Sequence, residues 1–199
     1  MSADLENGYG DAPEAAAECI RLASEAGAVG GSIEDATGRA DEPIYDKEYA
    51  ADRIRAAAEA AHGLGYAFTI TARAENYLHG RPDLEDTIER LQAYQEAGAD
   101  VLYAPGLRTR EDIREVVRSV GQPVNVLMGM AGIDLDLTAL SELGVRRVSV
   151  GSALSRVALG AFLKAAGEMR TLGTFRFADS ATGYAELNAE FGDGTRGLS

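Results

Sequence analysis

Hydrophobic and polar positions follow two alternating patterns along the chain. Alanine-rich segments with an apolar residue every three or four positions predict amphipathic helices, and short apolar runs predict buried strands. In the first such pair, Ala16, Ile20 and Ala23 fall on one helical face. Gly27 then ends the helix, because glycine readily takes the left-handed conformation of a helix C-terminus, and a strand follows at residues 28–33.

The pair of helix and strand recurs through the chain. Further helices are predicted at about residues 47–61 and 83–97, and a long alanine-rich helix at about residues 153–171. Counting the start of the chain, the predicted strands are residues 2–6, 28–33, 67–72, 99–104, 123–128 and 146–150. Strands this short and apolar, alternating with helices, indicate a parallel sheet that is covered by helices.

Two α/β architectures fit this order of elements, an open doubly wound sheet and a closed (β/α)8 barrel. A dinucleotide-binding sheet needs a GxGxxG motif after an early strand, and none follows one here. A barrel builds its active site from the carboxyl ends of several strands, which is where the polar candidates Asp4, Glu6, Glu34, Arg73 and Asn125 fall. We therefore predict an incomplete TIM-type (β/α)8 barrel of about six βα units.

The chain is long enough for one compact domain. It has 199 residues, of which 46% are hydrophobic, and this supports a substantial core. Residues 1–172 are expected to form the partial barrel. The last stretch, residues 173–199, is polar and glycine-rich around a short helical pattern, and we interpret it as a C-terminal helical appendage and tail.

Charge and cysteine content restrict the partners and the compartment. A formal net charge of −13 opposes binding to nucleic-acid phosphates. The chain has no apolar run of about 18 residues that would span a membrane, and its start lacks the basic and apolar regions of a signal peptide. Cys19 is the single cysteine, which fits a reducing compartment. We expect a cytoplasmic protein that binds neither nucleic acid nor membrane.

Three carboxylates are candidate metal ligands. Asp4 and Glu6 are two positions apart, so in a regular strand both side chains would point to the same face, and Glu34 ends the next strand. Carboxylates that converge at one strand-end surface need a cation to stay ionised. Oxygen ligands without histidine or cysteine favour a hard ion such as Mg²⁺ or Mn²⁺. The alternative is that all three are ordinary carboxylates that cap helices or face solvent.

Arg73 and Asn125 are candidate substrate ligands. Arg73 directly follows an apolar strand, where its planar guanidinium can hold a carboxylate or phosphonate through two parallel hydrogen bonds. An ion pair with Glu75 is the alternative role for this arginine. Asn125 interrupts the apolar run "PVNVLMG", and its buried amide needs a partner, either the substrate or the backbone.

Six segments taken together resemble one enzyme superfamily. They are "ADLENGYGDAPEAAAE", "AGAVGGSIED", "FTITARAENYLHG", "AGADVLYAPGL", "PVNVLMG" and "LGVRRVSVGSAL", in this order. This ordered set resembles the isocitrate lyase/phosphoenolpyruvate mutase superfamily, also called the phosphonomutase superfamily. The resemblance extends from Ala3 to about Phe191, and includes "YAELNAEFG" near the end.

The resemblance implies a Mg²⁺-dependent lyase or mutase with a TIM-type barrel. Such enzymes act on small α-oxo acids, 2-hydroxy acids or phosphonates, cleave or form C–C or C–P bonds through an enolate-like state, and are homo-oligomers (dimers or tetramers) with exchanged C-terminal helices. By motif match, the metal carboxylates are Asp4, Glu6 and Glu34. The resemblance assigns catalytic roles to Arg73 and Glu34, and substrate binding to Gly8, Tyr9, Arg73 and Asn125.

The sequence departs from the superfamily pattern in three places that affect function, one of which is Pro105 in "YAPGL", where several lyases have glutamate. The superfamily normally has two βα units before the "D-x-E-x-G-Y-G" strand, so the first two barrel strands are expected to be missing from this chain. Either another chain fills that gap or the reading frame begins upstream. The cysteine-bearing K-[KR]-C-G-H loop of the true lyases is replaced by "DATGRADEPIYD", which favours a mutase-like or decarboxylase-like reaction. The alternative is a catalytically inactive remnant that serves as a subunit or interaction module.

Overall fold

The computed structural model describes residues 1–191, and their strands form one parallel sheet of six strands in sequential order. The strands are β1 (Ser2–Asp4), β2 (Gly30–Glu34), β3 (Thr69–Arg73), β4 (Val101–Tyr103), β5 (Val124–Leu127) and β6 (Arg147–Ser149). The helices are α1 (Pro13–Glu25), α2 (Lys47–His62), α3 (Leu84–Glu96), α4 (Arg110–Ser119), α5 (Leu137–Glu142), α6 (Ala153–Leu172), the 3-10 helix η1 (Arg176–Ser180) and α7 (Tyr184–Phe191).

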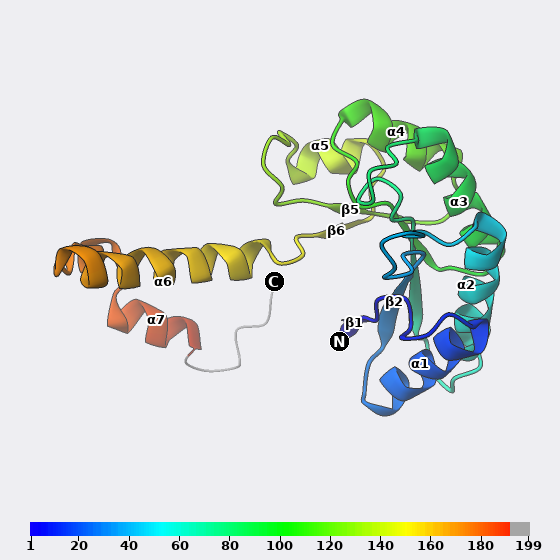
Figure 1. Cartoon of the computed structure of the whole chain (residues 1–199), viewed down its shortest axis with the longest axis horizontal. Coiled ribbons are helices and arrows are strands. Elements are labelled where there is room, and N and C mark those ends of the chain that lie inside the picture. Colours follow the sequence, from blue (N-terminus) through cyan, green and yellow to red (C-terminus); the bar gives the residue numbers. More distant parts are fainter. Residues whose placement is uncertain (192–199) are drawn as a thin grey trace. The chain divides into compact units, whose positions relative to one another are not determined.

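The curled sheet confirms the predicted fold class, an α/β fold with an incomplete TIM-type barrel. Each strand pairs in parallel with the next one in sequence, from β1 to β6. Figure 1 shows α1 to α4 following one another along the outer side of the sheet. Sequential parallel strands with covering helices are the construction of a (β/α)8 barrel.

Strand alternation separates the core from the candidate site. Ile33, Ile70 and Leu102 are fully buried in the strands, and they belong to the same apolar cluster as Ile20 of α1 and Ile54 of α2. Burying a side chain of this size contributes roughly 1.5–3 kcal/mol of hydrophobic free energy. Successive residues of a strand point to opposite faces, so polar strand residues that flank these positions face away from the helices.

The strand register brings polar residues from neighbouring strands to the same level. Arg73, the last residue of β3, is paired with Glu34 on β2 and with Tyr103 on β4. Tyr103 is in turn paired with Asn125 on β5. The carboxyl ends of these strands therefore bring their polar side chains together at one edge of the sheet.

The first strand is shorter than the sequence predicted. We expected strand geometry from residue 2 to residue 6, with Asp4 and Glu6 on one face, but β1 ends at Asp4. Glu6 has a φ of 51°, in the left-handed region that side chains other than glycine rarely adopt. The prediction of a shared strand face for Asp4 and Glu6 was therefore wrong, because the chain turns at Glu6.

The C-terminal part forms a compact unit of its own. The described residues divide into residues 1–151 and a second unit that begins at residue 152. The domain boundary expected after residue 172 stays a prediction. The structure thus groups α6 with the C-terminal stretch, and none of the side chains of α6 is buried. Residues 192–199 of the predicted appendage lie outside the described residues. Among residues 1–191, no helix combines the length and apolar character needed to cross a bilayer.

Candidate active site

Arg73 lies at the centre of a cluster of carboxylates. Its Nη1 donates to both side-chain oxygens of Asp4, at 2.9 and 3.0 Å. Its Nη2 lies 3.1 Å from Oε2 of Glu34 and 2.8 Å from Oε1 of Glu75. The Arg73, Glu34 and Glu75 side chains are largely buried, whereas 62% of the Asp4 side chain is exposed. One guanidinium therefore joins the carboxyl ends of β1, β2 and β3.

The carboxylates of this cluster outnumber its cation. Asp4, Glu34 and Glu75 share the Arg73 guanidinium, and Glu6 adds a further negative charge nearby. Burial raises the pKa of Glu34 to about 7; Arg73 opposes this rise, and the surrounding carboxylates add to it. Burial also raises the pKa of Glu75, again against the effect of Arg73. The cluster is short of positive charge, which a bound cation would supply.

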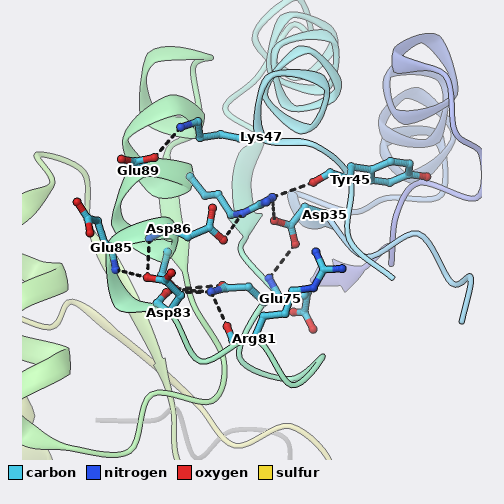
Figure 2. A network of polar contacts seen from close by, with 12 residues as sticks. Asp35, Tyr45, Lys47, Glu75, Arg81, Asp83, Glu85, Asp86 and Glu89 are labelled. Carbon is cyan, nitrogen blue, oxygen red and sulfur yellow. Dashed lines mark hydrogen bonds and ion pairs between the residues drawn. The ribbon is translucent and has the colours of Figure 1, made fainter. Parts of the chain in front are cut away.

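A buried network behind the cluster holds its backbone in place. Figure 2 shows Asp35, next in sequence to Glu34, directed toward Glu75. Oδ1 of Asp35 accepts a hydrogen bond from the Glu75 N–H at 2.8 Å, and Oδ2 accepts from Tyr94 at 2.6 Å and Arg90 at 3.1 Å. Only 2% of Asp35 and none of Tyr94 is exposed. Because three groups donate hydrogen bonds to the buried carboxylate of Asp35, this residue fixes the relative positions of β2, β3 and α3.

The loop between β1 and α1 is held by a buried arginine of α2. Arg53 is 1% exposed, and it donates hydrogen bonds to three backbone oxygens of this loop, those of Asn7, Gly10 and Asp11. The loop contains two further residues with positive φ, Gly8 at 80° and Tyr9 at 58°. Gly8 is buried against α1, whereas 73% of Tyr9 is exposed. Of the two predicted substrate ligands in this loop, only Tyr9 presents a side chain to solvent.

Asn125 lies in a row of neutral polar groups beside Arg73. It is 1% exposed, and its Nδ2 donates to Oγ of Ser149 on β6 at 3.0 Å. Its Oδ1 is buried, and no described residue donates a hydrogen bond to it. Ser149 also acts to lower the pKa of Tyr103, whose ring lies 5.3 Å from Cζ of Arg73. The unpartnered oxygen of Asn125 leaves an acceptor open for a ligand.

The predicted metal ligands fit a hard cation in donor type and in charge. Asp4, Glu6 and Glu34 offer only carboxylate oxygens, which suit Mg²⁺ or Mn²⁺, and the cluster has excess negative charge. Within residues 1–191, however, no group of three or more acidic, histidine or cysteine side chains is arranged to hold a metal ion. In this arrangement the guanidinium of Arg73 provides the positive charge between Asp4 and Glu34.

Sequence reasoning missed several residues that shape the site. Asp35 and Tyr94 were not singled out, because nothing in the local sequence shows that α3 reaches behind β2. Glu75 was considered only as an alternative partner for Arg73, and the structure shows this ion pair to be buried. Tyr103 is the last residue of β4. The rule that polar residues at strand ends build the active site of a barrel would therefore have identified it.

Comparison with known proteins identifies the family. A family model described as phosphoenolpyruvate phosphomutase matches residues 1–170. The chain belongs to this family. Within the superfamily, it is 33% identical over 157 residues to an oxaloacetate decarboxylase of Pseudomonas entomophila, which covers 76% of this chain and 52% of the decarboxylase. The chain thus spans about half the length of that relative.

Solved structures agree with membership of the phosphoenolpyruvate phosphomutase family. A protein of Burkholderia cenocepacia that is provisionally assigned as a lyase or mutase is 62% identical, with a TM-score of 0.92 over 97% of this chain and 69% of that chain. Phosphonopyruvate hydrolase, solved with oxalate and Mg²⁺, is 26% identical, with a TM-score of 0.79 over 96% of this chain and 68% of that chain. Lyases and mutases are therefore among the relatives of this chain.

Proposed function

We propose that the chain is a Mg²⁺-dependent lyase or mutase that acts on a small α-oxo acid, 2-hydroxy acid or phosphonate. The observation that carries the proposal is the Arg73 cluster: a largely buried arginine surrounded by carboxylates that exceed it in charge. Family membership supports the same proposal, because the relatives named above include an oxaloacetate decarboxylase and a phosphonopyruvate hydrolase. Both names describe small oxo acids as substrates.

Arg73 is the proposed ligand for the anionic group of the substrate. Neighbouring carboxylates raise its already high pKa, so its guanidinium stays charged at any physiological pH. Its Nη1 binds both oxygens of Asp4 in the two-bonded geometry that a substrate carboxylate or phosphonate would use. Oε1 of Glu75 accepts a hydrogen bond from Nε of Arg73 at 2.9 Å, which orients the guanidinium.

Asp4, Glu6 and Glu34 are the proposed metal ligands, and Glu34 and Arg73 the proposed catalytic pair. When bound, Mg²⁺ or Mn²⁺ supplies positive charge that stabilises the oxyanion of an enolate-like state. Both side-chain oxygens of Asp4 accept hydrogen bonds from Arg73, and Oδ1 also accepts from the Ser32 hydroxyl, so Asp4 belongs to the Arg73 cluster. Gly8, Tyr9 and Asn125 remain proposed substrate contacts.

Turnover of two substrates tests the proposal. The full chain is incubated with oxaloacetate or phosphonopyruvate, with Mg²⁺, Mn²⁺ or excess EDTA, and loss of substrate is measured. We expect metal-dependent turnover of at least one of them, and Arg73→Lys should raise KM, because lysine cannot form the two parallel hydrogen bonds. If a folded sample turns over neither substrate with either metal, the alternative of a catalytically inactive subunit is supported instead.

A further inference from the structure

Tyr103 is a phenol next to Arg73 for which the proposed function has no role. It ends β4, between Arg73 on β3 and Asn125 on β5. Only 8% of the residue is exposed, and Cζ of Arg73 lies 5.3 Å from the centre of its ring. A guanidinium over an aromatic face is an attractive contact, which holds the two side chains together. A substrate anion bound by Arg73 would therefore lie beside this phenol.

The Tyr103 hydroxyl has Ser149 as its polar neighbour. Ser149 acts to lower the pKa of the phenol, and its own Oγ accepts a hydrogen bond from Asn125. Within residues 1–191, we find no acceptor that takes the phenolic proton of Tyr103 in a hydrogen bond of normal geometry. The side chain is thus oriented by its neighbours, while its O–H remains free to donate to a ligand.

Charges around Tyr103 suit a group that gives up a proton and regains it. Burial raises the pKa of this phenol, so it is protonated at neutral pH; Ser149 and Arg73 act in the opposite direction, and Glu75 and Asp4 add to the rise. Ser149 and Arg73 therefore offset part of the cost of forming the phenolate in a buried setting. A proton donor must be protonated in its resting state, and this phenol is.

We propose that Tyr103 is the proton donor to the carbon of the enolate-like state, an inference that rests on the function proposed above. With oxaloacetate, the C–C bond to the leaving carboxylate breaks, CO₂ departs, and the electron pair stays on the substrate as the enolate of pyruvate. The O–H bond of Tyr103 then breaks as its proton forms the new C–H bond of pyruvate. The phenolate, stabilised by Arg73 and Ser149, recovers its proton from water.

Tyr103→Phe tests this role, because it removes only the hydroxyl. Tyr66→Phe is the matched control: its hydroxyl contacts Ser24 and the Ala28 carbonyl, and it has no part in the Arg73 cluster. Loss of oxaloacetate and formation of the keto form of pyruvate are followed together in the presence of Mg²⁺. An enolate that the protein does not protonate is released as enolpyruvate and becomes the keto form only in solution.

Tyr103→Phe should show a lag between loss of oxaloacetate and appearance of keto-pyruvate, with a KM for oxaloacetate within about twofold of wild type. Enzymic protonation should slow by about 100-fold or more. Ser149→Ala keeps the phenol, so its lag should be shorter than that of Tyr103→Phe. Wild type and Tyr66→Phe should show no lag.

Three other results would overturn the assignment in different ways. If Tyr103→Phe forms keto-pyruvate without a lag, whether fast or slow, the proton comes from another group and the proposed function stands. A wild-type chain that turns over neither oxaloacetate nor phosphonopyruvate would overturn the proton-donor role together with the proposed function. A wild-type chain that turns over only phosphonopyruvate would overturn the proton-donor role and leave the proposed function standing.

Discussion

Arg73 sets the charge balance of the site at the scale of single residues. Its guanidinium contacts Asp4, Glu34 and Glu75, and these carboxylates leave a net negative charge around it. The strand-end rule predicted that Asp4, Glu34 and Arg73 lie near one another, and the structure brings them into contact. The rule holds because the carboxyl ends of parallel strands meet at one edge of a sheet. Their roles in metal binding and catalysis stay predictions.

Other residue-scale features depend on contacts that the sequence does not show. Asp35 is identified only through its bonds to Tyr94 and Arg90, which are 59 and 55 residues away in sequence. The left-handed turn at Glu6 could not be predicted either, because glutamate rarely adopts a positive φ. The local sequence pattern therefore predicted which residues gather at the edge of the sheet. It did not predict which hydrogen-bond partners hold them there.

Glu34→Gln should change how stability depends on pH. The pKa of Glu34 rises from the ordinary value of 4.5 to about 7 in the folded chain, chiefly through burial. The folded state therefore binds this proton more tightly than the unfolded state does. The resulting stabilisation is fully present below pH 4.5 and is lost as the pH rises to about 7, a difference of up to roughly 3 kcal/mol.

Urea unfolding in EDTA at several pH values measures this effect. Wild type should lose more stability than Glu34→Gln between about pH 4.5 and 7, so the difference between them should grow in favour of the variant. Exposed Glu14→Gln is the matched control and should follow wild type. Parallel pH profiles for wild type and Glu34→Gln would contradict the burial-raised pKa.

At the scale of elements, the order and type of the helices and strands were predictable, whereas the β1–α1 loop was not. Periodic apolar faces identified the elements, and the fold class is confirmed by the sheet. The loop owes its shape to Arg53, which reaches from α2 to three backbone oxygens, and to the close approach of Gly8 to α1. Both are tertiary contacts, so hydrophobic periodicity carries no signal for them.

Gly8→Ala should destabilise the chain through this loop. Gly8 has a φ of 80°, and a Cβ built there would lie 2.9 Å from Cα of Ala16. The backbone would have to shift, in addition to the strain of a positive φ, and we expect a loss of roughly 2–3 kcal/mol.

Gly38→Ala separates the two causes of that loss. Gly38 has a similar φ of 75°, but a Cβ there would meet nothing within 4 Å, so only backbone strain of about 1 kcal/mol should appear. Thermal or urea unfolding of both variants measures the difference. Equal losses in the two variants would show that the contact between Gly8 and α1 does not matter.

At the scale of the whole molecule, we propose that the chain is a homo-oligomer in which α6 packs against a second copy. None of the side chains of α6 is buried, and several large apolar ones are mostly exposed, among them Leu154, Val157, Phe162 and Leu163. Apolar side chains gathered on one helix are seldom left in water. A second copy is the proposed partner because the superfamily resemblance implies exchanged C-terminal helices.

Phe162→Asp should weaken this assembly. Phe162 is 67% exposed in the single chain, so the substitution should leave the fold of the chain intact while placing a charge in the contact between copies. Sedimentation velocity should show an oligomer for wild type and smaller species for Phe162→Asp. Thr171→Asp adds the same charge at an exposed polar position on the opposite side of the helix and should keep the oligomer. A wild-type chain that sediments as a monomer at all concentrations would contradict the proposal.

The most direct test of the central claim is calorimetric titration of the full chain with Mg²⁺. If Asp4, Glu6 and Glu34 hold the metal, wild type should bind one Mg²⁺ per chain, and Asp4→Asn should abolish binding while remaining folded by circular dichroism. Glu14→Gln, which removes a remote exposed carboxylate, should bind as wild type does. Absence of Mg²⁺ binding by folded wild type, or unchanged binding by Asp4→Asn, would contradict the assignment of this cluster as the metal site.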